Sequence, residues 1–154
     1  MTYHAMRTYA FDELSLGQQE TVMRTVMETD IVGFAAVSGD NNPIHLNEDY
    51  AASTRFGQRI AHGMFTASLI SAVIGTQMPG PGAIYLSQTL QFMAPVKIGD
   101  VVVVVVVEVA EKVEKGRRVR LVCRCVVDGK SVLEGEAWVS VPAARGAGPI
   151  AKGA

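Results

Sequence analysis

The sequence predicts an α+β fold in which one antiparallel sheet wraps around a single long helix. Residues 61–77 form one long and almost wholly apolar run, and residues 83–141 contain strand-like segments joined by short turns. An antiparallel meander that follows one buried helix can be arranged in few ways, and the simplest wraps the sheet around the helix. The 154 residues correspond to one ordinary domain, which is long enough to bury a core.

A strand and then a short helix are expected near the start of the chain. Residues 20–29, ETVMRTVMET, mix β-branched and polar side chains in the manner of a strand. Residues 30–39, DIVGFAAVSG, follow as a short helix. Asp30 can cap this helix at its front, and Gly39 can end it in a left-handed conformation. The polar segment SGDNNPIH, residues 38–45, therefore comes directly after an apolar helix.

Two further helices are expected before the strand-rich half of the chain. Asn47 is the expected cap of a short helix over residues 47–54. The run AHGMFTASLISAVIGTQ, residues 61–77, contains several small residues and is too long for a strand. It is therefore predicted to be a buried helix that begins near Gly63.

Four strands are predicted in the second half of the chain, at residues 83–92, 101–109, 117–128 and 131–141. In the third strand, polar and apolar positions alternate, and the apolar face consists of Val119, Leu121, Cys123 and Cys125. Asp128 and Gly129 predict a hairpin turn after this strand. The two cysteines share one face of a strand, so we expect buried thiols instead of a disulfide or a metal site.

Composition and charge argue against several classes of function. The chain has 14 Lys and Arg against 15 Asp and Glu, so no basic surface predicts binding to nucleic acid or to an anionic membrane. The valine-rich run at 101–109 is too short to span a membrane, and the N-terminus lacks the apolar core of a signal peptide. A cytoplasmic protein is expected. No phosphate-loop, Gly-x-Ser-x-Gly or multi-histidine signature is present, which disfavours nucleophilic hydrolysis and metal catalysis.

A family resemblance rests on FAAVSGDNNPIHLNEDYAASTRFGQRIAHGMFTASLISAVIG (34–75) and GAIYLSQTLQFMAPVKIGD (82–100). The pattern is an Asp, four residues, a His and, further on, Ala-His-Gly at the start of a helix. It resembles the MaoC-like (R)-specific enoyl-CoA hydratases, and nothing in the motif departs from the family pattern. The resemblance implies a single hot-dog domain over residues 11–142. We expect an N-terminal tail at 1–10 and a flexible C-terminal tail at 143–154.

The resemblance also implies the catalytic residues. By position, Asp40 and His45 correspond to the catalytic pair, and Gly63 to a backbone donor for the thioester oxygen. The chemistry of these residues agrees, because hydration of a conjugated thioester requires a base for water and a proton donor for the α-carbon. Asp40 would be the general base, with His45 as its orienting and proton-donating partner. Free N–H groups at the start of the buried helix would hold the developing enolate oxygen.

Each of these residues, taken singly, also has a purely structural interpretation. Asp40 alone can be a turn residue, and His45 alone can be a surface histidine or a hydrogen-bonded core histidine. Their combination in this motif favours catalysis. For His62 we favour a packing or hydrogen-bonding role near the helix start, with Gly63 providing the chemistry. His4 is expected to lie in a frayed terminus without a functional role.

Contacts with the acyl chain can be predicted by counting along the helix from Gly63. The helical period places Ala67, Ile70 or Ser71, and Ile74 on one stripe, and we expect Ala67, Ser71 and Ile74 to bind the acyl tail. The resemblance implies an acyl-CoA or acyl-carrier-protein thioester as substrate, no cofactor and no metal. It also implies a homodimer or higher homo-oligomer formed through the sheet. The valine-rich strand could form an exposed edge or pair with a second subunit.

Three functions stay open at this point. The first is an (R)-specific enoyl-CoA hydratase, which adds water to trans-2-enoyl-CoA, reversibly and with syn geometry, to give (R)-3-hydroxyacyl-CoA. The second is a 3-hydroxyacyl-carrier-protein dehydratase of fatty-acid synthesis, since the same chemistry runs in reverse. The third is a non-catalytic hot-dog module that binds acyl thioesters. The presence of both Asp40 and His45 argues against the third.

Overall fold

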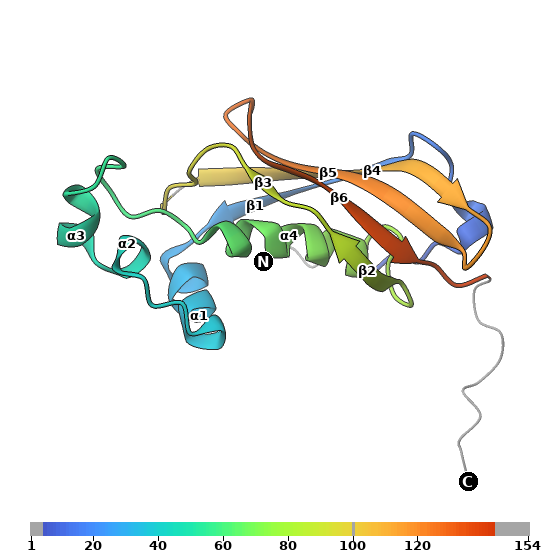
Figure 1. The fold of residues 1–154 in the computed structure, drawn as a ribbon, viewed down its shortest axis with the longest axis horizontal. Coiled ribbons are helices and arrows are strands. Elements are labelled where there is room, and N and C mark those ends of the chain that lie inside the picture. The colour runs from blue at the N-terminus through green and yellow to red at the C-terminus, as the bar shows by residue number, and fades with distance from the viewer. Residues whose placement is uncertain (1–4, 100, 144–154) are drawn as a thin grey trace, which may run out of the picture.

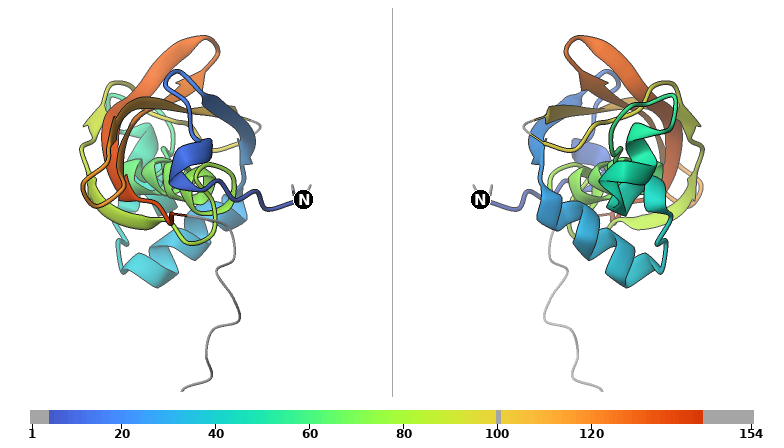
Figure 2. Two further views of the ribbon diagram at one scale, coloured as in Figure 1. Left: turned by 90° about the vertical axis from the view of Figure 1, so that its right-hand side faces the viewer. Right: turned by 90° about the vertical axis from the view of Figure 1, so that its left-hand side faces the viewer.

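The fold is described by a computed structural model over residues 5–99 and 101–143. One curved sheet covers a long helix, α4, and three shorter helices gather at one end (Figure 1). End-on, the sheet curls around α4 (Figure 2), so the predicted α+β architecture is confirmed. The elements are a 3-10 helix (Phe11–Glu13), β1 (Gln19–Val26), α1 (Glu28–Ser38), α2 (Pro43–Leu46), α3 (Glu48–Ala52), α4 (Gly63–Thr76), β2 (Ile84–Gln88), β3 (Gln91–Phe92), β4 (Val101–Val113), β5 (Arg118–Val127) and β6 (Lys130–Ser140).

The sheet has the strand order β1-β4-β5-β6-β2, and the two-residue strand β3 also pairs with β6. Each of these pairings is antiparallel. The β5–β6 hairpin turns at Asp128 and Gly129, which have φ values of 50° and 76°. A two-residue type I′ turn requires positive φ at both central positions, so the predicted Asp-Gly hairpin is confirmed.

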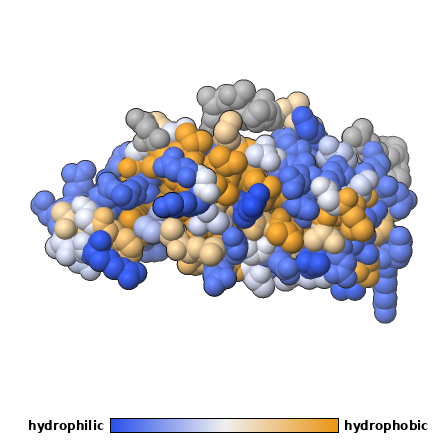
Figure 3. Space-filling model, turned by 90° about the horizontal axis from the view of Figure 1, so that it is seen from above, coloured by the Kyte–Doolittle hydropathy of each residue, from blue (hydrophilic) through white to orange (hydrophobic). Residues whose placement is uncertain are grey.

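The valine run of β4 supplies side chains to both faces of the sheet. Val103 and Val105 are buried, whereas Val102 is exposed, because successive side chains of a strand point to opposite faces. Met23 of β1 and Val122 of β5 are also exposed. Figure 3 looks onto the sheet side of the molecule and shows an apolar area between hydrophilic margins.

The expectation that the valine-rich strand forms an edge is wrong, because β4 lies between β1 and β5.

Helix α4 lies in the concave face of the sheet and begins at Gly63, as predicted. Its buried apolar side chains pack in one cluster with the inward-facing side chains of β4, β5 and β6. Full burial of an aliphatic or aromatic side chain is worth about 1.5–3 kcal/mol, so this cluster is the main attraction between helix and sheet. The apolar side chains that α4 contributes are Phe65, Leu69, Ile70, Val73 and Ile74.

The first helix starts earlier than predicted. α1 begins at Glu28, and Met27, not Asp30, is its cap residue. The Asp30 carboxylate lies in the first turn, where it accepts the Met27 N–H at 2.9 Å and pairs with Arg24 at 2.6 Å. An acidic side chain in the first turn can reach back to a free N–H group, so Asp30 stabilises the start from inside the helix. The predicted end at Gly39 is confirmed by its φ of 77°.

A short helix that was not predicted, α2, lies between α1 and α3. Asn42 caps it by accepting the Ile44 N–H at 3.2 Å, and Pro43 takes its first helical position. An Asn-Pro pair is a known helix-start signal, so this element could have been predicted. Asn47 caps α3 as predicted, by accepting the Tyr50 N–H at 2.8 Å.

Three strand predictions differ from the structure in their limits, and the first of them, predicted at 20–29, ends at Val26. The strand predicted at 83–92 is divided into β2 and β3, with Thr89 at the break. Gly135 of β6 lies against this break, and a Cβ there would come within 1.9 Å of the Thr89 carbonyl oxygen, so only glycine fits. β4 continues to Val113, beyond the predicted 101–109, because its pairing with β5 extends that far.

Part of the expected N-terminal tail is hydrogen-bonded to the domain. Arg7 and Tyr9 donate their backbone N–H groups to carbonyl oxygens at and just after the end of α4, at 2.9 and 2.8 Å. Residues 1–4, including His4, and residues 144–154 of the expected C-terminal tail lie outside the described residues. Within the described chain, no helix has the length and apolar character needed to cross a membrane. The domain limits remain predictions.

Candidate active site

The polar segment SGDNNPIH forms a hydrogen-bonded turn between α1 and α2. After Gly39, the Asp40 N–H donates to the Ser38 hydroxyl at 3.1 Å. One carboxylate oxygen of Asp40 accepts the Asn42 N–H at 3.2 Å, and the Asn42 side chain in turn caps α2. Asp40 therefore shapes the turn with one oxygen and keeps further acceptor capacity for a ligand.

His45 is buried in α2, and its ring is held by the loop that precedes α4. The ring atom Nδ1 lies 2.7 Å from the Ile60 carbonyl oxygen. A carbonyl can only accept a hydrogen bond, so Nδ1 carries the hydrogen and Nε2 of the uncharged ring keeps a free lone pair. The Ile60 N–H donates back to the Ile44 carbonyl at 3.3 Å, so the loop and α2 are bonded at two points.

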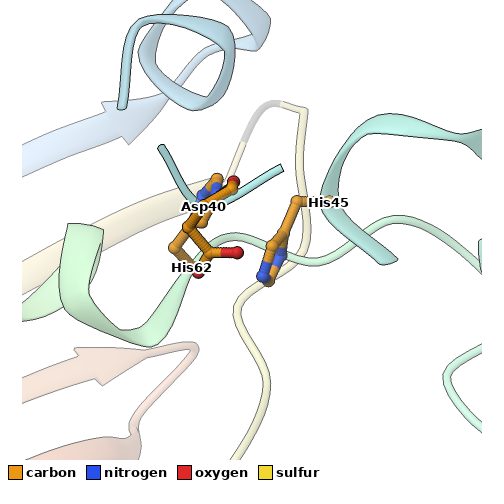
Figure 4. A group of neighbouring side chains, drawn as sticks. All are labelled: Asp40, His45 and His62. Atoms are coloured by element: carbon orange, nitrogen blue, oxygen red, sulfur yellow. Dashed lines mark hydrogen bonds between the residues drawn. The ribbon is translucent and has the colours of Figure 1, made fainter. Parts of the chain in front are cut away.

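His62 contacts both members of the predicted catalytic pair. Its ring stacks on that of His45, with centroids 3.8 Å apart and 27° between the planes. Its Nε2 donates to the Asp40 backbone carbonyl at 2.9 Å. Figure 4 shows the three side chains gathered around one point. The packing and hydrogen-bonding role expected for His62 next to Gly63 agrees with this arrangement.

Asp40, His45 and His62 are close enough to hold one small molecule. Their potential ligand atoms all lie within 4.8 Å of one another. A tetrahedral zinc ion would need lone pairs that converge on one point about 2 Å from each ligand. The two imidazoles are stacked, so their in-plane lone pairs run side by side and do not converge. The cluster therefore suits a water molecule between Asp40 and His45 better than a metal ion.

Burial lowers the pKa of His45 below its usual value of 6.5. The hydrogen bond to Ile60 and the charge of Asp40 act in the opposite direction, whereas His62 and Arg59 lower the pKa further. At neutral pH the imidazole is therefore uncharged, and its Nε2 can accept a hydrogen bond. A carboxylate and a neutral imidazole are both acceptors, so together they can hold the two hydrogens of one water.

The start of α4 adds backbone donors to the same place. The N–H groups of Phe65 and Thr66 donate to the His62 carbonyl at 3.0 and 3.3 Å, whereas those of Gly63 and Met64 have no partner among the described residues. The first N–H groups of a helix lack intrahelical partners and carry partial positive charge. They can therefore stabilise a negative charge on a bound oxygen atom.

Glycine at position 63 lets the sheet edge approach the helix start. A Cβ at this position would lie 2.6 Å from the ring of Phe92 in β3. The Phe92 side chain is half-exposed and lines the pocket together with Gly63. A larger residue at 63 would displace this ring and cover the free N–H groups, so glycine keeps the helix start accessible.

A pocket of about 440 Å³ connects these groups. Asp40, His45 and Gly63 all line it, so the structure brings the predicted catalytic residues together. The sequence did not predict the other walls, and those in β3 and β6 reach the pocket only through the pairing of the sheet. These walls are largely apolar and include Phe56, Ile60, Thr66, Phe92, Val132 and Leu133.

The predicted acyl-chain stripe does not line this pocket. Ser71 is exposed, Ile74 is buried in the core, and Ala67 packs against that core. The helical period places both Thr66 and Ala67 near the side of Gly63, and the pocket lies on the Thr66 side. Counting along the helix identifies a face, but the neighbouring strands determine where space is left beside it.

Comparison with known proteins identifies the family. Residues 15–128 match the family model described as the MaoC like domain. The chain is 54% identical over 146 residues to a 3-hydroxybutyryl-CoA dehydratase of Methylorubrum extorquens, covering 95% of this chain and 92% of the relative. It is 51% identical over 133 residues to an (R)-specific enoyl-CoA hydratase of Rhodospirillum rubrum, covering 86% of this chain and 92% of the relative.

A solved structure shares the fold. The unliganded R-hydratase from Pseudomonas aeruginosa superposes with a TM-score of 0.85 at 44% sequence identity, covering 96% of this chain and 99% of that chain. This similarity confirms the predicted hot-dog fold. Because the family model covers most of the chain and two relatives exceed half identity over nearly their full length, the chain belongs to the MaoC-like domain family.

Proposed function

We propose that the chain is an (R)-specific enoyl-CoA hydratase, which adds water to trans-2-enoyl-CoA to give (R)-3-hydroxyacyl-CoA and catalyses the reverse dehydration. The observation that carries this proposal is the pocket in which Asp40, His45 and Gly63 meet. The names of the two relatives, a hydratase and a dehydratase of CoA thioesters, support it.

The reaction would begin with a water molecule between the Asp40 carboxylate and Nε2 of His45. Both groups accept hydrogen bonds, so each takes one hydrogen of the water and the oxygen lone pair faces C3 of the enoyl group. As the C3–O bond forms, one O–H bond of the water breaks and Asp40 takes the proton. The π electrons between C2 and C3 move toward the thioester oxygen.

The resulting enolate would be stabilised at its oxygen by the free N–H groups of Gly63 and Met64. Asp40 then returns its proton to C2, which restores the thioester carbonyl. Because the hydroxyl and the proton arrive from one side, the addition is syn. In this sequence of steps His45 orients the water as an acceptor, which differs from the proton-donating role expected for it from the sequence.

Coenzyme A is the carrier that we propose, in preference to an acyl-carrier protein. Both relatives above half identity are named for CoA substrates. A carrier-protein partner is acidic and docks best on a basic surface. The formal net charge of -1 and the nearly equal numbers of acidic and basic residues give no such preference.

The direct test is a spectrophotometric assay with crotonyl-CoA. The purified protein should remove the absorbance of the conjugated thioester, and 3-hydroxybutyryl-CoA should restore it in the reverse reaction. Binding of crotonyl-CoA without any change in absorbance would overturn the proposal and favour a non-catalytic module. Conversion of a carrier-protein thioester alone would favour the dehydratase of fatty-acid synthesis.

Hydration is expected to persist below pH 6.5. The proposed mechanism requires unprotonated Nε2 in His45, and burial keeps the pKa of His45 below its usual 6.5. As the pH falls through that lowered pKa, His45 gains a proton and can no longer accept a hydrogen bond from water, so kcat/KM for hydration falls. The acid limb of the crotonyl-CoA profile should therefore lie below pH 6.5, and a limb above it would contradict the role of His45.

The acyl chain is proposed to lie against Leu133 and its neighbours in the pocket wall. Leu133→Ala should raise kcat/KM for six- and eight-carbon enoyl-CoA several-fold relative to crotonyl-CoA, since each methylene contact is worth about 0.8 kcal/mol. Ile74→Ala is the matched control, because Ile74 is similarly buried but does not line the pocket. If only Ile74→Ala changed the chain-length preference, the acyl chain would lie along the predicted stripe of α4 and not against Leu133.

A homodimer formed through the β2 edge is also proposed. β2 is an end strand of the sheet, and its Ile84 and Leu86 side chains are 60% and 51% exposed. An edge strand with unpaired backbone groups and exposed apolar side chains favours pairing with a second copy. The protein should sediment as a dimer or larger homo-oligomer. The Leu86→Asp variant should sediment as a smaller assembly, because a charged side chain at this edge opposes pairing. A monomeric wild-type protein would contradict the proposal.

A further inference from the structure

The helix that carries His45 depends on contacts from outside itself. α2 spans only Pro43–Leu46, and one turn of helix is not stable alone. The carbonyl groups at the end of a helix also lack partners within it. In α2 these carbonyls are bonded by groups that follow it in the chain, so the position of His45 is determined by these partners.

Arg59 provides the shortest of these bonds. Its Nε donates to the His45 carbonyl oxygen at 2.6 Å. Its Nη1 donates to both carboxylate oxygens of Glu28, at 3.0 and 2.9 Å. The Arg59 side chain is only 12% exposed, whereas that of Glu28 is 57% exposed. A cation at the C-terminal end of a helix is also favourable, because negative partial charge accumulates on the free carbonyls there.

The bond from Arg59 to Glu28 connects the segment that carries His45 to the helix that precedes Asp40. Glu28 is the first residue of α1, and Asp40 comes just after the end of α1. Ile60, which follows Arg59, bonds the His45 ring through its carbonyl oxygen. Residues 59 and 60 therefore hold the backbone and the ring of His45 and connect α2 to the helix that leads to Asp40.

We propose that Arg59, oriented by Glu28, is a positioning residue that fixes α2 so that the His45 imidazole meets the water held by Asp40. The inference rests on the proposed hydratase function. Arg59 does not line the pocket that contains Asp40 and His45, so it acts on the reaction through the position of α2. Misplacement of a catalytic group by about 1 Å can cost about a hundredfold in rate. Loss of this contact should therefore lower kcat and leave KM nearly unchanged.

The charge of Arg59 provides a second measurable effect, a change in the pKa of His45. Besides burial, the pKa of His45 responds to Ile60, His62, Asp40 and Arg59. Of these, His62 and, less strongly, the Arg59 charge lower the pKa, so removal of Arg59 should raise the pKa of His45 slightly and move the acid limb of hydration to higher pH. Glu48 and Asp49 of α3 line a hollow together with Arg59, and both keep their charge in the Arg59, Glu28 and Arg24 variants, so they contribute equally to every His45 pKa that is compared.

The variants Arg59→Ala, Arg59→Lys and Glu28→Gln test the proposal, with Arg24→Ala as the matched control. Arg24 pairs at 2.6 Å with Asp30, which lies in α1 as Glu28 does, but Arg24 does not contact His45. The measurements are kcat and KM for crotonyl-CoA and the pKa of His45 from NMR titration of its ring protons. The chain has three histidines, so the His45 signal can be assigned from its loss in His45→Gln.

We expect Arg59→Ala to lower kcat by about ten- to a hundredfold, with KM nearly unchanged and the pKa of His45 raised. Arg59→Lys keeps the charge but loses the planar group that bonds both partners, so kcat should fall while the pKa of His45 stays close to that of the wild type. Glu28→Gln should lower kcat less than Arg59→Ala. Arg24→Ala should match the wild type in both measurements.

Equal kcat in Arg59→Ala and Arg24→Ala, or a raised KM with unchanged kcat in Arg59→Ala, would overturn the positioning role. If circular dichroism shows that Arg59→Ala does not fold, the proposal is tested with Arg59→Lys and Glu28→Gln. Wild-type kcat in both of these variants would overturn it. A wild-type protein that cannot hydrate crotonyl-CoA overturns the proposed function instead. In that case the NMR titration still shows whether Arg59 acts on His45.

Discussion

Replacement of Asp40 by asparagine is expected to preserve the fold and to lower the turnover of crotonyl-CoA by about a hundredfold or more. The amide has nearly the same shape as the carboxylate, and its oxygen can still accept the Asn42 N–H that shapes the turn. It cannot take a proton from water, so formation of the C3–O bond loses its base. The loss is measured as kcat, and circular dichroism compares the folds.

Asp49→Asn is the matched control for this variant. Asp49 is exposed on α3 and does not line the pocket. The same exchange of carboxylate for amide at this position should leave turnover close to that of the wild type, because surface substitutions away from a site have small effects. Near-normal turnover in a correctly folded Asp40→Asn protein would remove Asp40 from the mechanism.

A loss of similar size, about a hundredfold, is expected for His45→Gln. The single amide of glutamine cannot replace both ring nitrogens in place, so either the bond to the Ile60 carbonyl or the acceptor that orients the water is lost. Asp40 and His45 are proposed to hold the same water, so the double variant Asp40→Asn with His45→Gln should lose little more activity than either single variant. Separate roles would instead multiply the losses to about ten-thousandfold, which would contradict a shared water.

The main elements of the fold follow from local patterns in the sequence. Alternation in the third predicted strand identifies Cys123 and Cys125 as inward-facing, and both are fully buried. The limits of elements were harder to predict because they depend on residues elsewhere in the chain. Asp30 lies inside α1, where Arg24 holds its carboxylate, and the length of β4 is set by its pairing with β5.

The candidate site could be predicted only where its residues are neighbours in sequence. Asp40 and His45 flank one turn, and Gly63 begins a recognisable helix, so the motif identifies all three. Leu133 reaches the pocket through its register with Phe92, and nothing near it in the sequence indicates this. Arg59 bonds a backbone carbonyl, which every residue has, so its contact with His45 has no sequence signature.

Asp40 and His45 are proposed to act on one water molecule at one face of the substrate. Hydration of crotonyl-CoA in heavy water tests this most directly, with the configuration and labelling of the product determined by NMR after conversion to a chiral derivative. We expect (R)-3-hydroxybutyryl-CoA with one deuterium at C2, added to the same face as the hydroxyl group. A product of (S) configuration would contradict (R)-specific hydration, and deuterium divided between the two positions at C2 would contradict delivery of water and proton from one face.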